Sequence, residues 1–165
     1  MRLPIEKHHV WQAYKHVRMN KGTHGVDEQD WEQFDRKRYH NLYIIWNRLS
    51  SGVYFPKPVK RVMIPKPGGG ERPLGIPVVS DRIAQEVLRR ILEKKKKKHF
   101  HADSYAYRKG KNAHQALDEW RHRTDYYSWA VDVDIKGYFD SIPHDKLMQA
   151  IVHYCPMLKW LHTYL

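Results

Sequence analysis

Apolar side chains recur at helical spacing along the first fifty residues. Residues 5–19 carry them on one stripe, and Asn-Lys-Gly at 20–22 suits a helix end. Asp27 is a suitable N-cap for a second helix that would extend to Leu49. The pattern therefore predicts two N-terminal helices. Their apolar positions are Val10, Trp11, Tyr14 and Val17 in the first, and Trp31, Phe34, Leu42, Ile45, Trp46 and Leu49 in the second.

Strand-like segments around a glycine-rich turn come next. Residues 59–64 are typical of a strand, and Pro-Gly-Gly-Gly at 67–70 is typical of a tight turn. Residues 71–76 return as the partner strand. A β-hairpin is therefore predicted over residues 59–76.

Three further helices are predicted after the hairpin. Ser80 suits the N-cap of the first, whose last turns hold the five lysines at 94–98. That lysine run is either a solvated helix end or a contact for a nucleic-acid backbone. Asn112 and Gln115 have capping-box spacing for the second helix, and Pro143 suits the first turn of the third.

Residues 128–135 show period-two alternation, which predicts a strand with one buried face. Asp132 and Asp134 would then point to the same side, roughly 6.5–7 Å apart. Two close carboxylates favour a divalent cation such as Mg²⁺. The alternative is that one is solvated on an edge strand and the other caps the turn at 136–137. The apolar members of the pattern are Trp129, Val131, Val133 and Ile135.

Charge then narrows the class of partner. Thirty Lys and Arg against eighteen Asp and Glu leave a formal net charge of +12, which favours a polyanion. Nucleic acid is the first candidate and an anionic membrane surface the second.

No apolar run approaches the ~20 residues that span a bilayer, so no membrane partner is expected. No signal-peptide pattern opens the sequence, which favours a cytoplasmic location of bacterial or organellar type. A single cysteine, Cys155, excludes a disulfide within one chain.

Basic residues beside the predicted turn add candidate chemistry. Lys66 and Arg72 flank the glycines, where their side chains suit phosphate oxygens. Alone, the segment is an ordinary basic hairpin. Together with a metal-binding carboxylate at Asp132 or Asp134, and with Phe139 as a surface for a sugar, it meets the requirements of metal-assisted nucleotidyl transfer.

Six ordered blocks resemble the opening blocks of group II intron reverse transcriptases, also called maturases. The resemblance covers about residues 10–155, and the order of the blocks makes it specific. The blocks lie at residues 18–27, 52–66, 72–77, 81–85, 100–110 and 134–140.

The resemblance implies an α+β right-hand polymerase fold, with N-terminal helices and fingers over 1–127 and the start of the palm over 128–165. It implies that Asp134 binds the catalytic Mg²⁺, with Mn²⁺ as an alternative, and that the carbonyl of Ile135 joins it. It places Phe139 under the incoming sugar, where it favours deoxynucleotides. It implies that Lys66 and Arg72 bind the triphosphate. Lys136 and Gly137 are the remaining expected substrate contacts. Asp132 would be solvated or would contact the metal ligands without binding the metal itself. Asp140 would cap a turn.

The implied partners are an RNA template or intron RNA, a DNA primer and a dNTP. The oligomeric state stays open, with a homodimer as one candidate. The residues predicted to contact nucleic acid are Lys21, Arg61, Arg82, Arg108, Lys109 and Lys111.

The sequence departs from the family pattern in two ways. Ala106 stands where the family has glycine, which affects only the local backbone. The Tyr-x-Asp-Asp block with the other catalytic carboxylates does not occur. We therefore expect the chain to be the N-terminal part of an RNA-directed DNA polymerase and to be inactive by itself.

Two other functions fit parts of the pattern. The basic hairpin and N-terminal helices suit an RNA-binding splicing cofactor without polymerase activity, whose affinity would fall steeply with salt. A metal-dependent nuclease is the third possibility, but it needs a general base, for which His144 is the nearby candidate.

Overall fold

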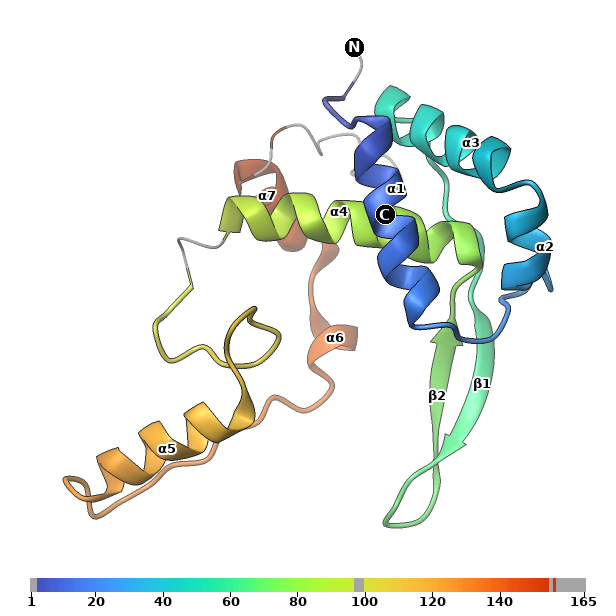
Figure 1. The fold of residues 1–165 in the computed structure, drawn as a ribbon. Helices are drawn as coiled ribbons and strands as arrows, with labels where there is room; N and C mark the ends of the chain where they lie inside the picture. The colour runs from blue at the N-terminus through green and yellow to red at the C-terminus, as the bar shows by residue number, and fades with distance from the viewer. Residues whose placement is uncertain (1–2, 97–99, 155, 157–165) are drawn as a thin grey trace.

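The computed structural model describes residues 3–96, 100–154 and 156. Its order is helical, then a hairpin, then helical again (Figure 1). The elements are α1 (Lys7–Met19), α2 (Trp31–Arg36), α3 (Arg38–Ser51), β1 (Lys60–Pro65), β2 (Glu71–Ile76), α4 (Val79–Lys96), α5 (Ala113–Thr124), α6 (Tyr138–Ser141) and α7 (His144–Tyr154).

The main core lies where α1 packs against α3 and α4. Figure 1 shows α1 crossing the long helix α4. The stripes predicted for the N-terminal helices supply much of this core, because helical spacing brings their apolar side chains to one face. The largest fully buried side chains include Val10 on α1, Phe34 on α2, Leu49 on α3, and Ile83 and Val87 on α4.

The predicted second helix is divided, and its start was predicted three residues too early. Asp30, not Asp27, caps α2: its carboxylate accepts the Gln33 amide at 2.7 Å, and the Gln33 side chain accepts the Asp30 amide at 3.1 Å. Asp27 instead accepts a hydrogen bond from Lys57 Nζ at 3.1 Å. Lys37, at φ −119° and ψ 31°, interrupts the helix between α2 and α3. A reciprocal capping box fixes a helix start more strongly than a lone Asp does.

The β-hairpin is confirmed, with β1 and β2 antiparallel and Ile64 opposite Arg72. Gly69 and Gly70 have φ values of 90° and 79°, a conformation that glycine adopts without strain. The Lys66 amide donates to the Gly70 carbonyl at 2.9 Å and closes the turn. In Figure 1 the hairpin projects from the helices as an arm.

The helix predicted from Ser80 forms, but it begins at Val79, so Ser80 lies inside α4 and is not its cap. The lysine run begins in the last turns of α4, and Lys97 and Lys98 lie outside the described residues. The capping box of α5 is confirmed, since Asn112 Oδ1 accepts the Gln115 amide at 2.9 Å.

The strand predicted over residues 128–135 does not form. Trp129 and Val131 are 91% and 87% exposed, so the expected buried face is open. A strand needs a hydrogen-bonded neighbour, and the only ladder among residues 3–96 and 100–154 joins β1 to β2. The alternating pattern is present at 128–135, but no strand among the described residues pairs with this segment. Cys155 lies outside the described residues.

Candidate functional site

Asp134 lies on the rim of an open hollow of about 640 Å³ just before α6. Gly137, at φ 62°, makes the turn into α6, and its carbonyl accepts the Ser141 amide at 3.1 Å. That turn places Phe139 on the same hollow, where its ring is 85% exposed. The hollow therefore combines a carboxylate, backbone oxygens and aromatic rings. Its lining is Val133, Asp134, Ile135, Gly137, Tyr138 and Phe139.

The two carboxylates of this segment are exposed. In the part of the chain that the structure describes, neither Asp132 nor Asp134 forms a hydrogen bond or an ion pair through its side chain. Because the strand is not formed, the prediction that both point to one side of it is wrong here. Lys136, beside them, is exposed as well.

The donor set at this hollow fits Mg²⁺ only in part. No group of three or more His, Cys, Asp or Glu side chains suited to a metal occurs among the described residues. The Asp134 carboxylate and the Ile135 carbonyl are hard oxygen donors of the kind Mg²⁺ prefers. Mg²⁺ commonly takes one or two carboxylates and completes its shell with water and substrate phosphates.

Lys66 and Arg72 lie at the tip of the hairpin arm, and both are exposed. Arg72 is opposite Ile64 near the end of the ladder, and Lys66 directly follows β1, so the two basic residues flank the turn. In Figure 1 the arm and the segment before α6 extend to the same side of α4. No hydrogen bond or ion pair between described residues joins the arm to Asp134, so the structure does not assemble the two halves into one closed site.

The residues predicted to contact nucleic acid fall into two groups. Lys21, Arg61 and Lys109 are exposed. Arg82 is half-buried: its Nε donates to the Pro77 carbonyl at 2.9 Å and its Nη2 donates to the Thr23 carbonyl. Burial lowers the pKa of Arg82. Its guanidinium therefore fastens the N-terminal loop to the start of α4.

Arg108 and Lys111 are held in the loop before α5. The Arg108 guanidinium lies 3.8 Å from the centre of the Phe100 ring, and Lys111 Nζ lies 4.3 Å from the centre of the Tyr105 ring. Lys111 also donates to the Ala102 carbonyl. Both cations stabilise this loop by contacts with aromatic faces.

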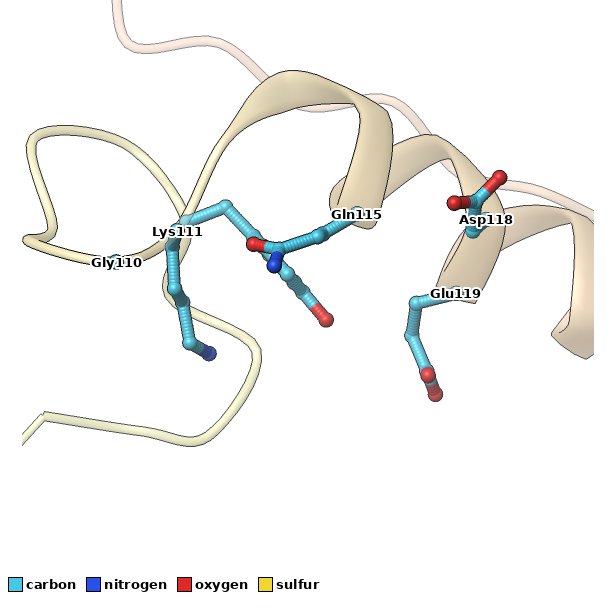
Figure 2. A pocket seen from close by; sticks show the side chains of 6 residues that line it. Gly110, Lys111, Gln115, Asp118 and Glu119 are labelled. Atoms are coloured by element: carbon cyan, nitrogen blue, oxygen red, sulfur yellow. The ribbon is translucent and has the colours of Figure 1, made fainter.

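A second hollow, of about 480 Å³, lies beside this loop and α5. Figure 2 shows Lys111 from the loop and Glu119 from α5 extending to the same side. Asp118 and Glu119 make part of its wall acidic. A hollow lined by both acidic and basic side chains does not favour the binding of a polyanion.

The sequence interpretation missed a buried polar cluster at the start of α4. Asp81 is 2% exposed and accepts hydrogen bonds from the Tyr54 hydroxyl at 2.6 Å and the Lys57 amide at 2.8 Å. The signal was present, because an acidic residue stands between the apolar pairs at 78–79 and 83–84. The cluster fixes the chain that leads into β1.

The described helices include none with the length and apolar character needed to cross a membrane.

Comparison with known proteins agrees with the blocks found in the sequence. Residues 64–165 match the family described as reverse transcriptase (RNA-dependent DNA polymerase), which is more than half of the chain. The chain therefore belongs to the reverse transcriptase family and is of the group II intron type.

Relatives of known name include the protein YkfC of Escherichia coli K12, which is 32% identical over 92% of this chain and 42% of YkfC. The group II intron-encoded protein LtrA of Lactococcus lactis is 34% identical over 84% of this chain and 23% of LtrA. The putative COX1/OXI3 intron 1 protein of Saccharomyces cerevisiae is 37% identical over 74% of this chain and 15% of that protein. The chain thus spans less than half the length of these relatives.

Proposed function

We propose that this chain is the N-terminal part of an RNA-directed DNA polymerase of the group II intron type. It would contribute the fingers over residues 1–127 and the first part of the palm over 128–165. The observation that carries the proposal is the hollow in which Asp134 and Phe139 lie either side of the Gly137 turn. The reaction is attack of a primer 3′-hydroxyl on the α-phosphate of a dNTP, with RNA as template.

In this proposal Asp134 and the Ile135 carbonyl hold Mg²⁺, or Mn²⁺ in its place. The ion supplies charge neutralisation at the phosphates. Asp134 is suited to this role because its carboxylate is exposed and forms no ion pair with a protein cation among the described residues. Asp132, two residues away, adds negative potential without being assigned as a ligand.

The remaining contacts concern the nucleotide. Phe139 would lie under the sugar, and its exposed ring has the free face that this role requires. Lys136 and Gly137 would line the approach of the substrate. Lys66 and Arg72 would bind the outer phosphates, since a lysine provides a point charge and an arginine a planar fork for phosphate oxygens. The nucleotide itself would bring the hairpin tip and the hollow together.

We also propose that residues 129–135 become a palm strand when a neighbouring strand pairs with them. Their alternate apolar side chains are exposed, with Val133 at 79% and Ile135 at 61%. A neighbouring strand could bury this apolar face without a change of register, because the side chains already alternate with the period of a strand.

The hairpin arm offers the first test. In the intact polymerase, Arg72→Ala and Lys66→Ala should each raise the KM for dNTP by about 10- to 100-fold, because a hydrogen bond to a charged group is worth about 1.5–3 kcal/mol. Steady-state primer extension at varied dNTP concentration measures this.

Lys60→Ala is the matched control, because Lys60 begins β1 opposite Ile76, at the end of the hairpin away from the turn. It should leave the KM within about twofold. Equal effects of all three substitutions would contradict a phosphate role for the tip.

A second candidate function is RNA binding as a splicing cofactor, without polymerisation. The exposure of Lys21, Arg61 and Lys109 on a chain of net charge +12 favours it. For about five phosphate contacts, the affinity of the 165-residue chain for RNA should fall about 10²-fold between roughly 50 and 200 mM salt.

A triple substitution of these three residues by glutamine sharpens that test. It should reduce the slope of log affinity against log salt by about 2 for single-stranded RNA. An affinity that does not change with salt would contradict this function. Filter binding or fluorescence anisotropy over a salt series measures both quantities.

A further inference from the structure

A concave aromatic surface lies between α1 and α3, and we call it the aromatic groove. It encloses about 230 Å³. Side chains four residues apart on one helix are neighbours, so Lys7 and Trp11 line it from α1, while Tyr39 and Tyr43 line it from α3. The full lining is Lys7, Trp11, Tyr39, Leu42, Tyr43 and Trp46.

Two of its rings are fixed and two are presented to solvent. Trp46 Nε1 donates to the Ile5 carbonyl at 2.8 Å, and Trp11 packs against the core. Tyr39 and Tyr43 are 72% and 50% exposed. Trp11 and Tyr39 stack with an interplanar angle of 11° and their centroids 6.3 Å apart. The groove thus has a rigid aromatic floor and two tyrosine rings that are exposed to solvent.

A cation lies over each half of the groove. Lys7 Nζ is 4.8 Å from the centre of the Trp46 ring and 5.6 Å from that of Tyr43. The Arg38 guanidinium is 4.8 Å from the centre of the Tyr39 ring. Within residues 3–96 and 100–154, neither Lys7 nor Arg38 forms an ion pair with a carboxylate. Both therefore keep an uncompensated positive charge beside an aromatic face.

The surroundings of the groove add positive charge. Two further cations, Arg36 and Lys37, come just before Arg38 at the start of α3. Burial lowers the pKa of His9, so this histidine of α1 does not add to that charge at neutral pH. Two carboxylates of these helices and their caps already have partners: Glu6 lies 3.1 Å from His8 Nδ1, and Asp35 accepts hydrogen bonds from Tyr14 at 2.6 Å and Arg18 at 2.9 Å. Charge complementarity therefore favours an anionic ligand, and the exposed tyrosine rings favour one that carries flat, stackable groups.

We propose that the aromatic groove binds a short unpaired stretch of RNA, with bases stacked on Tyr39 and Tyr43 and phosphates against Lys7 and Arg38. Base–aromatic stacking combined with cations along the backbone is the usual chemistry of single-strand binding. The choice of RNA rests on the proposed function. The groove shares no residue with the Asp134 hollow, so it is a second, separate nucleic-acid contact.

The test uses the 165-residue chain, an oligouridylate of about 12 nucleotides and an RNA duplex of the same length. Tyr39→Ala and Tyr43→Ala should each weaken binding of the oligouridylate by about 5- to 10-fold, because each removes one stacking surface. Binding of the duplex should stay within about twofold, since its bases are already stacked. Fluorescence anisotropy gives both dissociation constants.

Matched variants separate stacking from simple charge. Tyr39→Phe keeps the ring and should bind like the unmodified chain. Lys7→Gln should weaken single-strand binding more than Lys15→Gln, since Lys15 is an exposed lysine of the same helix that does not line the groove. Far-ultraviolet circular dichroism and thermal melts check that each variant is folded.

Two outcomes would overturn the proposal. One is an equal loss of duplex and single-strand binding in the tyrosine variants, which would indicate backbone contact alone. The other is unchanged RNA binding with an altered oligomeric state in sedimentation, which would assign the groove to a second copy of the chain. Either result leaves the Asp134 hollow intact, so it is distinguishable from failure of the polymerase proposal.

Discussion

Replacing Asp134 by asparagine is expected to reduce primer extension by the intact polymerase at least about 10³-fold, because a metal ligand that neutralises phosphate charge contributes several kcal/mol. Asparagine keeps the shape of the side chain and one oxygen but removes the charge. The side chain is exposed and makes no hydrogen bond or ion pair with the rest of the described chain, so the substitution should not affect folding. Single-turnover extension of a primer on an RNA template measures the loss.

Asp132→Asn is the matched control for this substitution. It removes the same charge two residues away, and it should cost about tenfold or less, as expected for a group that acts only through its potential. Affinity for RNA should be unchanged in both variants. In the 165-residue chain, Mn²⁺ should broaden the amide resonances of residues 133–137, and Asp134→Asn should abolish that broadening. Extension that survives in Asp134→Asn would contradict the proposed metal ligand.

Local signals in the sequence predicted most of the helical part of the fold. The stripe over 5–19 and the capping box at Asn112 depend on neighbours within one or two turns, and both are confirmed. The second helix was predicted as one piece because its apolar spacing continues through Lys37. Its start is set by the capping box of Asp30 and Gln33, while Asp27 accepts a hydrogen bond from Lys57. Its division occurs at Lys37, whose backbone departs from helical geometry.

The candidate site was harder to predict, because its parts depend on distant partners. The alternation at 129–135 correctly indicates which side chains are apolar, but a strand forms only beside another strand. The hairpin register places Lys66 and Arg72 on either side of the turn, yet nothing within the hairpin determines the distance from these residues to Asp134. The aromatic groove likewise escaped notice, since its rings come from two helices whose packing angle no local pattern specifies.

Removal of the Asp81 carboxylate should be the most destabilising single change at the start of α4. Asp81→Ala is expected to lower the free energy of unfolding by about 3 kcal/mol, because it leaves the Tyr54 hydroxyl and the Lys57 amide without their acceptor in a buried site. Urea unfolding of the 165-residue chain, followed by circular dichroism, measures the difference. A loss below about 0.5 kcal/mol would contradict a structural role for this cluster.

Tyr54→Phe is the graded control, since it removes one donor and keeps the ring, and it should cost about 1 kcal/mol. It also tests the pH dependence of the cluster. Burial, reinforced by the hydrogen bond to Asp81, raises the pKa of Tyr54 well above its usual value of about 10. The folded state therefore favours the protonated phenol, and this contribution is complete below pH ~10 and is lost as the pH rises further. Unfolding free energies measured between about pH 8 and 11 should fall more steeply for the unmodified chain than for Tyr54→Phe, and identical slopes would contradict the assignment.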